Sequence, residues 1–62
     1  MIEVRRLKGN AVYRYSKANN NFMFMIWAKC TLSETGIRKI IKAIETHTPE
    51  IVIEEYKISG LA

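Results

Sequence analysis

The most apolar stretch of the chain is Asn21–Thr31, with the sequence Asn-Phe-Met-Phe-Met-Ile-Trp-Ala-Lys-Cys-Thr. Residues 22–28 are all apolar, and no other stretch has so long an apolar run. A strand covered on both sides has two apolar faces at the same depth. The stretch therefore predicts the central strand of a sheet.

Side chains alternate across a strand, so the two faces of this predicted strand differ. One face would carry Phe22, Phe24, Ile26, Ala28 and Cys30. The other would carry Met23, Met25, Trp27, Lys29 and Thr31.

Two further strands are predicted before this stretch, over Ile2–Lys8 and Ala11–Lys17. The turn between them is expected at Lys8-Gly9-Asn10-Ala11, where glycine at the first central position suits a type II′ hairpin. Asparagines 19–21 supply the next connection, because asparagine tolerates left-handed backbone. These segments predict an antiparallel three-stranded meander.

An amphipathic helix is predicted after Thr31, because Ile37, Ile40, Ile41 and Ile44 recur at helical spacing. Thr31 with Glu34 would make a capping box, but Ser33 is preferred as N-cap because Leu32 can then contact Ile37. The helix should stop near Thr46 or His47, because Pro49 disfavours helix at the residue before it. Gly36 in the first turn suggests that the helix passes close to the sheet.

Ile51–Ile58 is predicted to be the final strand. The expected fold is α+β in the order β-β-β-α-β, formed by residues 1–62 as a single small domain. The helix would cover the sheet face that carries Phe22, Phe24 and Ile26, and nothing in the chain would cover the opposite face.

Residue types that carry chemistry are scarce. The chain has no aspartate, one cysteine and one histidine, which predicts no metal site, no cofactor and no catalytic residues. His47 is expected to interact with the last carbonyls of the helix rather than to act as an acid or base. Cys30 is expected to be a buried, inert thiol, with a reactive thiol as the alternative.

The cellular setting is predicted from what the chain lacks. No signal peptide or membrane-spanning run is visible, which favours a cytoplasmic protein without membrane contacts. Small domains are often stabilised by disulfides, a metal or a second subunit. Since one cysteine cannot form an intrachain disulfide, self-association into a dimer is the expected means of stabilisation.

The net charge of +4 is concentrated in the first half of the chain, where six basic residues accompany one glutamate. Such a distribution suits a polyanion such as DNA or RNA, or a solvated surface whose charges block aggregation of sheet edges. The candidate nucleic-acid-binding residues are Arg5, Arg6, Lys8, Arg14, Lys17 and Lys29.

The uncovered sheet face is the strongest functional feature in the sequence. Its candidate partner-binding residues are Met23, Met25, Trp27, Tyr13 and Tyr15. Trp, Tyr and Met are enriched at protein interfaces, although bases can also stack on aromatic rings and loops could bury the same residues as core. The sequence predicts a small, non-enzymatic regulatory module that binds itself or another protein, with nucleic-acid binding as the alternative.

Overall fold

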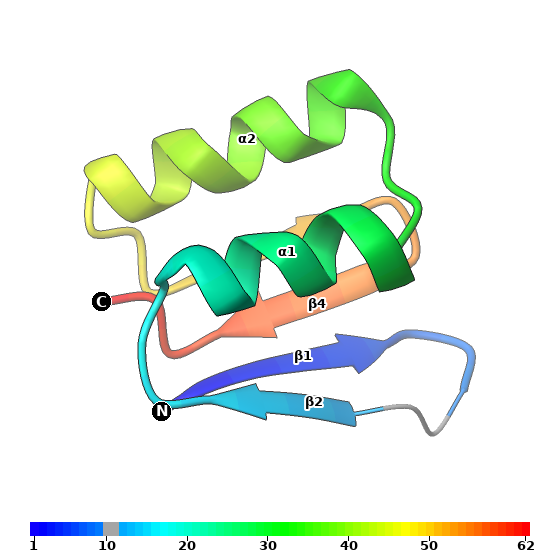
Figure 1. Cartoon of the computed structure of the whole chain (residues 1–62), viewed down its shortest axis with the longest axis horizontal. Helices are drawn as coiled ribbons and strands as arrows, with labels where there is room; N and C mark the ends of the chain where they lie inside the picture. The colour runs from blue at the N-terminus through cyan, green and yellow to red at the C-terminus, as the bar shows by residue number, and fades with distance from the viewer. Residues whose placement is uncertain (10–11) are drawn as a thin grey trace.

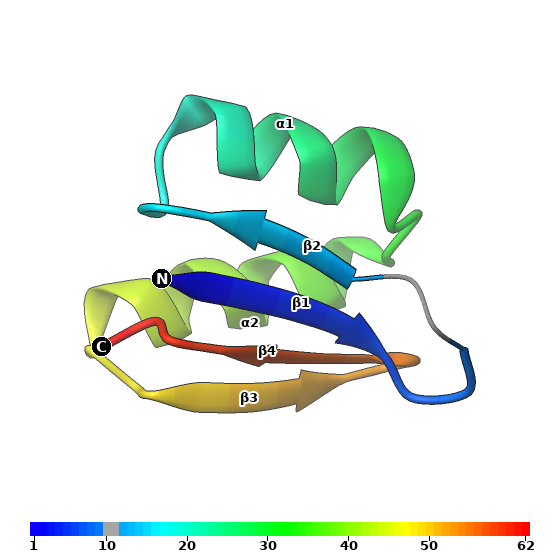
Figure 2. The same ribbon diagram turned by 90° about the horizontal axis from the view of Figure 1, so that it is seen from below.

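The computed structural model describes residues 1–9 and 12–62, and within them four strands and two helices (Figure 1). The elements are β1 Ile2–Arg6, β2 Val12–Tyr15, α1 Asn20–Lys29, α2 Glu34–Glu45, β3 Glu50–Ile53 and β4 Tyr56–Ser59. The strands form one antiparallel sheet in the order β2-β1-β4-β3, so the first and last strands are central neighbours (Figure 2). Both helices lie on the same side of this sheet.

The fold is α+β, as predicted, and its sheet is four-stranded and antiparallel throughout. The predicted order β-β-β-α-β and the single covering helix are wrong. Most of the stretch predicted as the central strand lies in helix α1, and the predicted final strand is a hairpin made of β3 and β4. The observed order is β-β-α-α-β-β.

Helix α1 begins at the asparagines that were expected to form a loop. The Asn19 side chain accepts a hydrogen bond from the backbone N–H of Phe22 at 3.1 Å, which makes Asn19 the N-cap. Phe22, Met25 and Ile26 follow at helical spacing and are buried. A run in which every residue is apolar fits a helical period as well as an alternating one, and for this reason the strand prediction failed.

Helix α2 agrees with its prediction. Ser33 is the N-cap, and its hydroxyl accepts a hydrogen bond from the N–H of Gly36 at 3.1 Å. Ile37 and Ile40 are buried on its inner side, Ile44 is partly buried against the core, and Ile41 is more exposed. The helix ends at Glu45, within one residue of the position expected from Pro49.

The predicted final strand is divided by a two-residue turn. Ile53 pairs with Tyr56 across Glu54-Glu55, and Glu54 has a left-handed backbone with a φ of 52°. The inward apolar residues change from odd to even positions across this turn, from Ile51 and Ile53 to Tyr56 and Ile58. A single strand cannot present both sets to one face, because its side chains alternate at every residue.

The turn at Glu54 also holds the start of α2. The Glu54 carboxylate accepts hydrogen bonds from the N–H of Ser33 at 3.1 Å and from its hydroxyl at 2.8 Å. A Cβ on Gly36 would collide with this carboxylate and would lie 3.0 Å from Cγ2 of Ile53. Glycine at position 36 therefore lets the helix approach β3 closely, as the sequence suggested.

The core lies between the inner face of the sheet and the two helices. Ile2, Val4, Ile53, Tyr56 and Ile58 contribute to it from the strands. Tyr15 packs its ring edge-on against Phe22, with the centroids 5.8 Å apart. The predicted turn at Lys8-Gly9-Asn10-Ala11 lies partly outside the described residues, so its type is not assigned.

Candidate functional site

The two helices together form an exposed apolar surface. Of the six aromatic residues, only Phe24 and Trp27 are mostly exposed, at 73% and 64% of their surface. They are three residues apart on α1 and are therefore neighbours on its solvent side. Ile41 of α2 is 43% exposed and Leu32 in the connection is half-buried. We call Phe24, Trp27, Leu32 and Ile41 the helix patch.

A groove of about 430 Å³ lies beside Trp27, between the two helices. Its lining residues are Trp27, Leu32, Glu34, Ile37, Arg38 and Ile41. Ile37 is buried, so it closes the groove toward the core, whereas Glu34 and Arg38 are exposed. A projecting indole and an apolar groove thus lie next to each other on the same surface.

The charges that line the groove neutralise each other. Arg38 donates a hydrogen bond to the Glu34 carboxylate at 2.6 Å, one helical turn away. Lys39 and Lys42 lie on the other side of α2, where they line a separate depression with Ala43 and Thr46. The positive charge of α2 is therefore directed away from the helix patch.

The connection between the helices contains a strained residue. Thr31 has a φ of 46°, which is unusual for a β-branched side chain. Its hydroxyl donates a hydrogen bond to the carbonyl of Cys30 at 2.8 Å. Leu32 and Ser33 follow at once, so this short connection places Leu32 in the groove and Ser33 at the start of α2.

Cys30 is buried at the end of α1, as expected of an inert thiol. Its sulfur lies 3.7 Å from the Met25 sulfur. Burial raises the pKa of the Cys30 thiol, and the Tyr56 hydroxyl and the Arg6 charge offset this only in part. A thiol with a raised pKa stays protonated at neutral pH and is a poor nucleophile.

The five residues predicted to bind a partner do not share a surface. Met25 is buried in the core, Met23 is partly buried, and Tyr13 and Tyr15 pack against the core from the inner face of the sheet. Trp27 alone among them is mostly exposed. The predicted uncovered strand face is wrong, because residues that alternate on a strand point in different directions on a helix.

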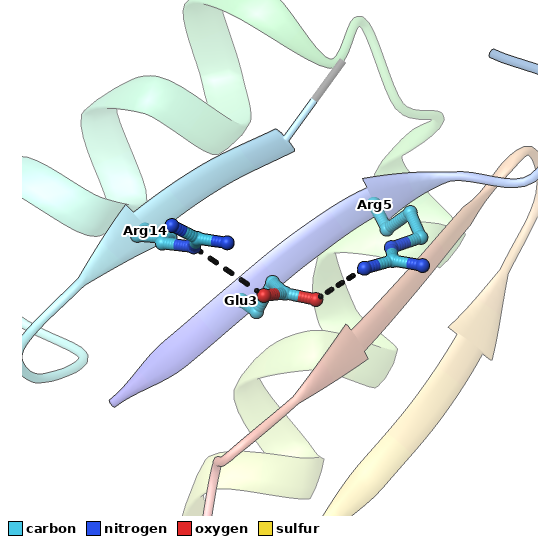
Figure 3. A network of polar contacts seen from close by, with 3 residues as sticks. All are labelled: Glu3, Arg5 and Arg14. Carbon is cyan, nitrogen blue, oxygen red and sulfur yellow. Dashed lines mark hydrogen bonds and ion pairs between the residues drawn. The ribbon is translucent and has the colours of Figure 1, made fainter. Parts of the chain in front are cut away.

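The predicted nucleic-acid-binding residues are dispersed. Arg5 and Arg14 flank Glu3 on the outer face of the sheet, with nitrogen–oxygen distances of 3.2 and 3.4 Å (Figure 3). Arg6 donates a hydrogen bond to the Tyr56 hydroxyl at 2.9 Å. The remaining three come from separate segments, the turn after β1, the loop after β2 and the end of α1: Lys8, Lys17 and Lys29.

The outer face of the sheet differs in character from the helix patch. The strand register places Arg14, Glu3, Ser59 and Glu50 in one row across the four strands. The next row contains Val12, Arg5, Lys57 and Val52. Lys57 lies 3.7 Å from the Glu50 carboxylate, so acidic residues accompany most of the cations on this face.

Sequence reasoning missed Phe24, Leu32 and Ile41 as candidate binding residues. Phe24 was placed beneath the helix because the alternating pattern grouped it with Phe22 and Ile26. The signal that would have separated them is the helical spacing of Phe22, Met25 and Ile26 directly after the N-cap Asn19. Leu32 and Ile41 carry no such signal, because their exposure depends on where α1 lies.

Comparison of the chain with protein-family models, with curated proteins and with solved structures finds no match. Within residues 1–9 and 12–62, no group of three or more His, Cys, Asp or Glu side chains is placed to hold a metal ion. None of the helices in the described part of the chain has the length and apolar character to cross a membrane. Inferences about function therefore rest on the geometry of the chain itself.

Proposed function

We propose that the chain is a small, non-enzymatic binding module that acts through protein–protein contacts at the helix patch. The observation that supports this is the pair of exposed aromatic side chains, Phe24 and Trp27, of which Trp27 lines an apolar groove. Aromatic residues of this kind dominate the binding energy of protein interfaces. A regulatory role follows from the same contact, because a module without chemistry of its own acts on what it binds.

The exposed area of the two aromatic residues is large enough to contribute substantially to binding. A fully buried aromatic side chain removes about 150–250 Å² from water. At their exposed fractions of 73% and 64%, Phe24 and Trp27 together offer roughly 200–340 Å². Burying that area is worth about 5–9 kcal/mol before the entropic costs of association.

The charge distribution favours a protein partner over a nucleic acid. Single-stranded nucleic acids bind where bases stack on rings and cations contact the phosphates beside them. The cation that lines the groove of the helix patch, Arg38, is paired with Glu34. The tyrosines that were expected to stack with bases pack against the core instead.

The proposal is tested with a photo-reactive phenylalanine analogue in the organism of origin. Position 24 carries the probe at the helix patch, and position 52 carries it in the matched control, because Val52 is 59% exposed on the outer face of the sheet. We expect one discrete adduct from position 24 and none from position 52. Absence of an adduct at position 24, or equal labelling at both positions, would contradict the proposal.

A second measurement tests the nucleic-acid alternative. The anisotropy of a labelled single-stranded oligonucleotide is followed as purified chain is added at low and at physiological salt. We expect that any oligonucleotide binding is either unsaturable or unchanged by Trp27→Ala. Tight binding that weakens steeply with salt and depends on Trp27 would instead favour nucleic acid as the partner of the helix patch.

A further inference from the structure

We propose that the occupant of the helix patch is a second copy of the chain, related by a two-fold axis. Trp27 of each copy enters the groove of the other, beside Leu32 and Ile41. This inference rests on the proposed function, because it names the partner for the same surface. It follows from the shape, the charge and the area of the helix patch.

The shape of the helix patch is suited to self-association. A two-fold interface uses the same surface on both subunits, so that surface must carry both a projection and its receptor. Trp27 projects from α1 with 64% of its surface exposed, and it also lines one side of the groove. Projection and groove are thus adjacent on one face, as two-fold pairing requires.

The charge of the helix patch also suits a second copy. Two chains of net charge +4 repel each other if their basic surfaces meet. At the groove, however, Glu34 and Arg38 sum to zero, and Lys39 and Lys42 lie on the other side of α2. Around a two-fold axis, Glu34 of one copy can pair with Arg38 of its partner.

The area that a dimer requires is available on this small chain. A stable interface buries about 800 Å² per partner. That is less than a fifth of the 4367 Å² accessible surface of the chain. Phe24 and Trp27 alone supply roughly 200–340 Å² of it as apolar area, and the flanking sides of both helices are available for the remainder.

The first test is sedimentation velocity of the purified chain over a range of concentrations. We expect a monomer–dimer equilibrium that Trp27→Ala and Phe24→Ala each weaken at least about tenfold. Val52→Ala is the control, because it truncates an apolar side chain that is also mostly exposed, at 59%, but lies on the opposite face. Circular dichroism of each variant shows whether both helices remain folded.

The second test mixes two variants, and only the interlocking arrangement predicts that the mixture associates more tightly than either variant alone. Trp27→Ala removes the projection and one wall of the groove but leaves the receiving residues Leu32 and Ile41, whereas Ile41→Arg obstructs the groove and leaves the projection. Neither variant alone can form an intact contact, but a mixed pair retains one of the two. We therefore expect the mixture to form heterodimers more tightly than either variant forms homodimers.

The outcomes separate this inference from the proposed function. A wild-type chain that stays monomeric, a dimer that survives Trp27→Ala, or one that Val52→Ala dissolves overturns the second copy as occupant. So does a mixture that associates no better than its components. If the chain is monomeric and the probe at position 24 still captures a different protein, the proposed function stands and the inference fails. If the chain is monomeric and position 24 captures nothing, both fail.

Discussion

Helices α1 and α2 pack against the same sheet but differ in the residues that they expose to solvent. Each directs apolar residues toward the sheet, Phe22 and Ile26 from α1 and Ile37 and Ile40 from α2. On the solvent side, α2 carries mainly charged residues, whereas α1 carries Phe24 and Trp27. Lys29 is the only charged residue of α1.

Packing against the sheet therefore does not account for the exposed apolar side of α1. Packing against one sheet requires one apolar side per helix, and α2 has an apolar stripe of that kind. The second apolar side of α1 contributes nothing to the core of the isolated chain, and exposed apolar patches commonly mark binding surfaces. The following predictions test the comparison between the two helices, in order of decreasing effect.

The inner sides of the two helices should contribute similarly to the free energy of unfolding. Phe22→Ala and Ile40→Ala each remove a fully buried side chain and leave a cavity, so the free energy of unfolding should fall by about 3–5 and 2–5 kcal/mol. Urea denaturation followed by circular dichroism measures both. A Phe22→Ala variant no less stable than Phe24→Ala would show that α1 does not pack as described.

The start of α2 should depend on a tertiary contact that α1 lacks. Gly36→Ala displaces the Glu54 carboxylate from Ser33, so it should lower the free energy of unfolding by about 1–2 kcal/mol despite the better helix propensity of alanine. Glu54→Ala should cost a similar amount. Because both variants break the same hydrogen bonds, the double variant should cost less than their sum in urea denaturation. Additive losses would contradict the coupling.

Each helix is followed, two residues after its end, by a non-glycine residue with left-handed backbone. Replacing either residue by glycine should stabilise the fold. His47 has a φ of 55°, and hydrogen bonds from His47 to Ile44 and from Thr48 to Ala43 close the end of α2. Thr31 holds the corresponding place after α1. Thr31→Gly and His47→Gly should each raise the free energy of unfolding by about 0.5–1 kcal/mol, with the larger gain at the β-branched Thr31. A loss of stability in thermal unfolding would show that these backbones are not strained.

The outer side of α1 should be almost irrelevant to the stability of the monomer. Phe24→Ser replaces an exposed side chain by one of similar helix propensity, so the free energy of unfolding at high dilution should change by no more than about 0.5 kcal/mol. At concentrations where the chain associates, the same variant should lower the melting temperature relative to wild type. A large loss at high dilution would place Phe24 in the core.

Several elements could be predicted because their sequence signals are local. Helix α2 has a stripe of isoleucines, a serine N-cap and a proline beyond its end. Strands β1 and β2 were predicted from short runs of neighbouring residues. Such signals depend on near neighbours, so the sequence is sufficient to find them.

The hairpin of β3 and β4 also had a signal, although it was overlooked. The shift of apolar residues from odd to even positions across Glu54-Glu55 breaks the period of a single strand. Glutamates are uncommon in tight turns, where glycine and asparagine are expected. At this turn the Glu54 carboxylate accepts hydrogen bonds from Ser33, the N-cap of α2, a contact that appears only in three dimensions.

The residues alone predict an α+β chain, an amphipathic helix after Thr31, and a stretch around Trp27 that is too apolar for one sheet face. The three-dimensional structure was needed to show that Asn20–Lys29 is helical, that Phe24 and Trp27 face solvent and that Trp27 lines a groove. The physical reason is that a uniformly apolar run has no period of its own. Its conformation is set by the N-cap at Asn19 and by the sheet and helix against which it packs.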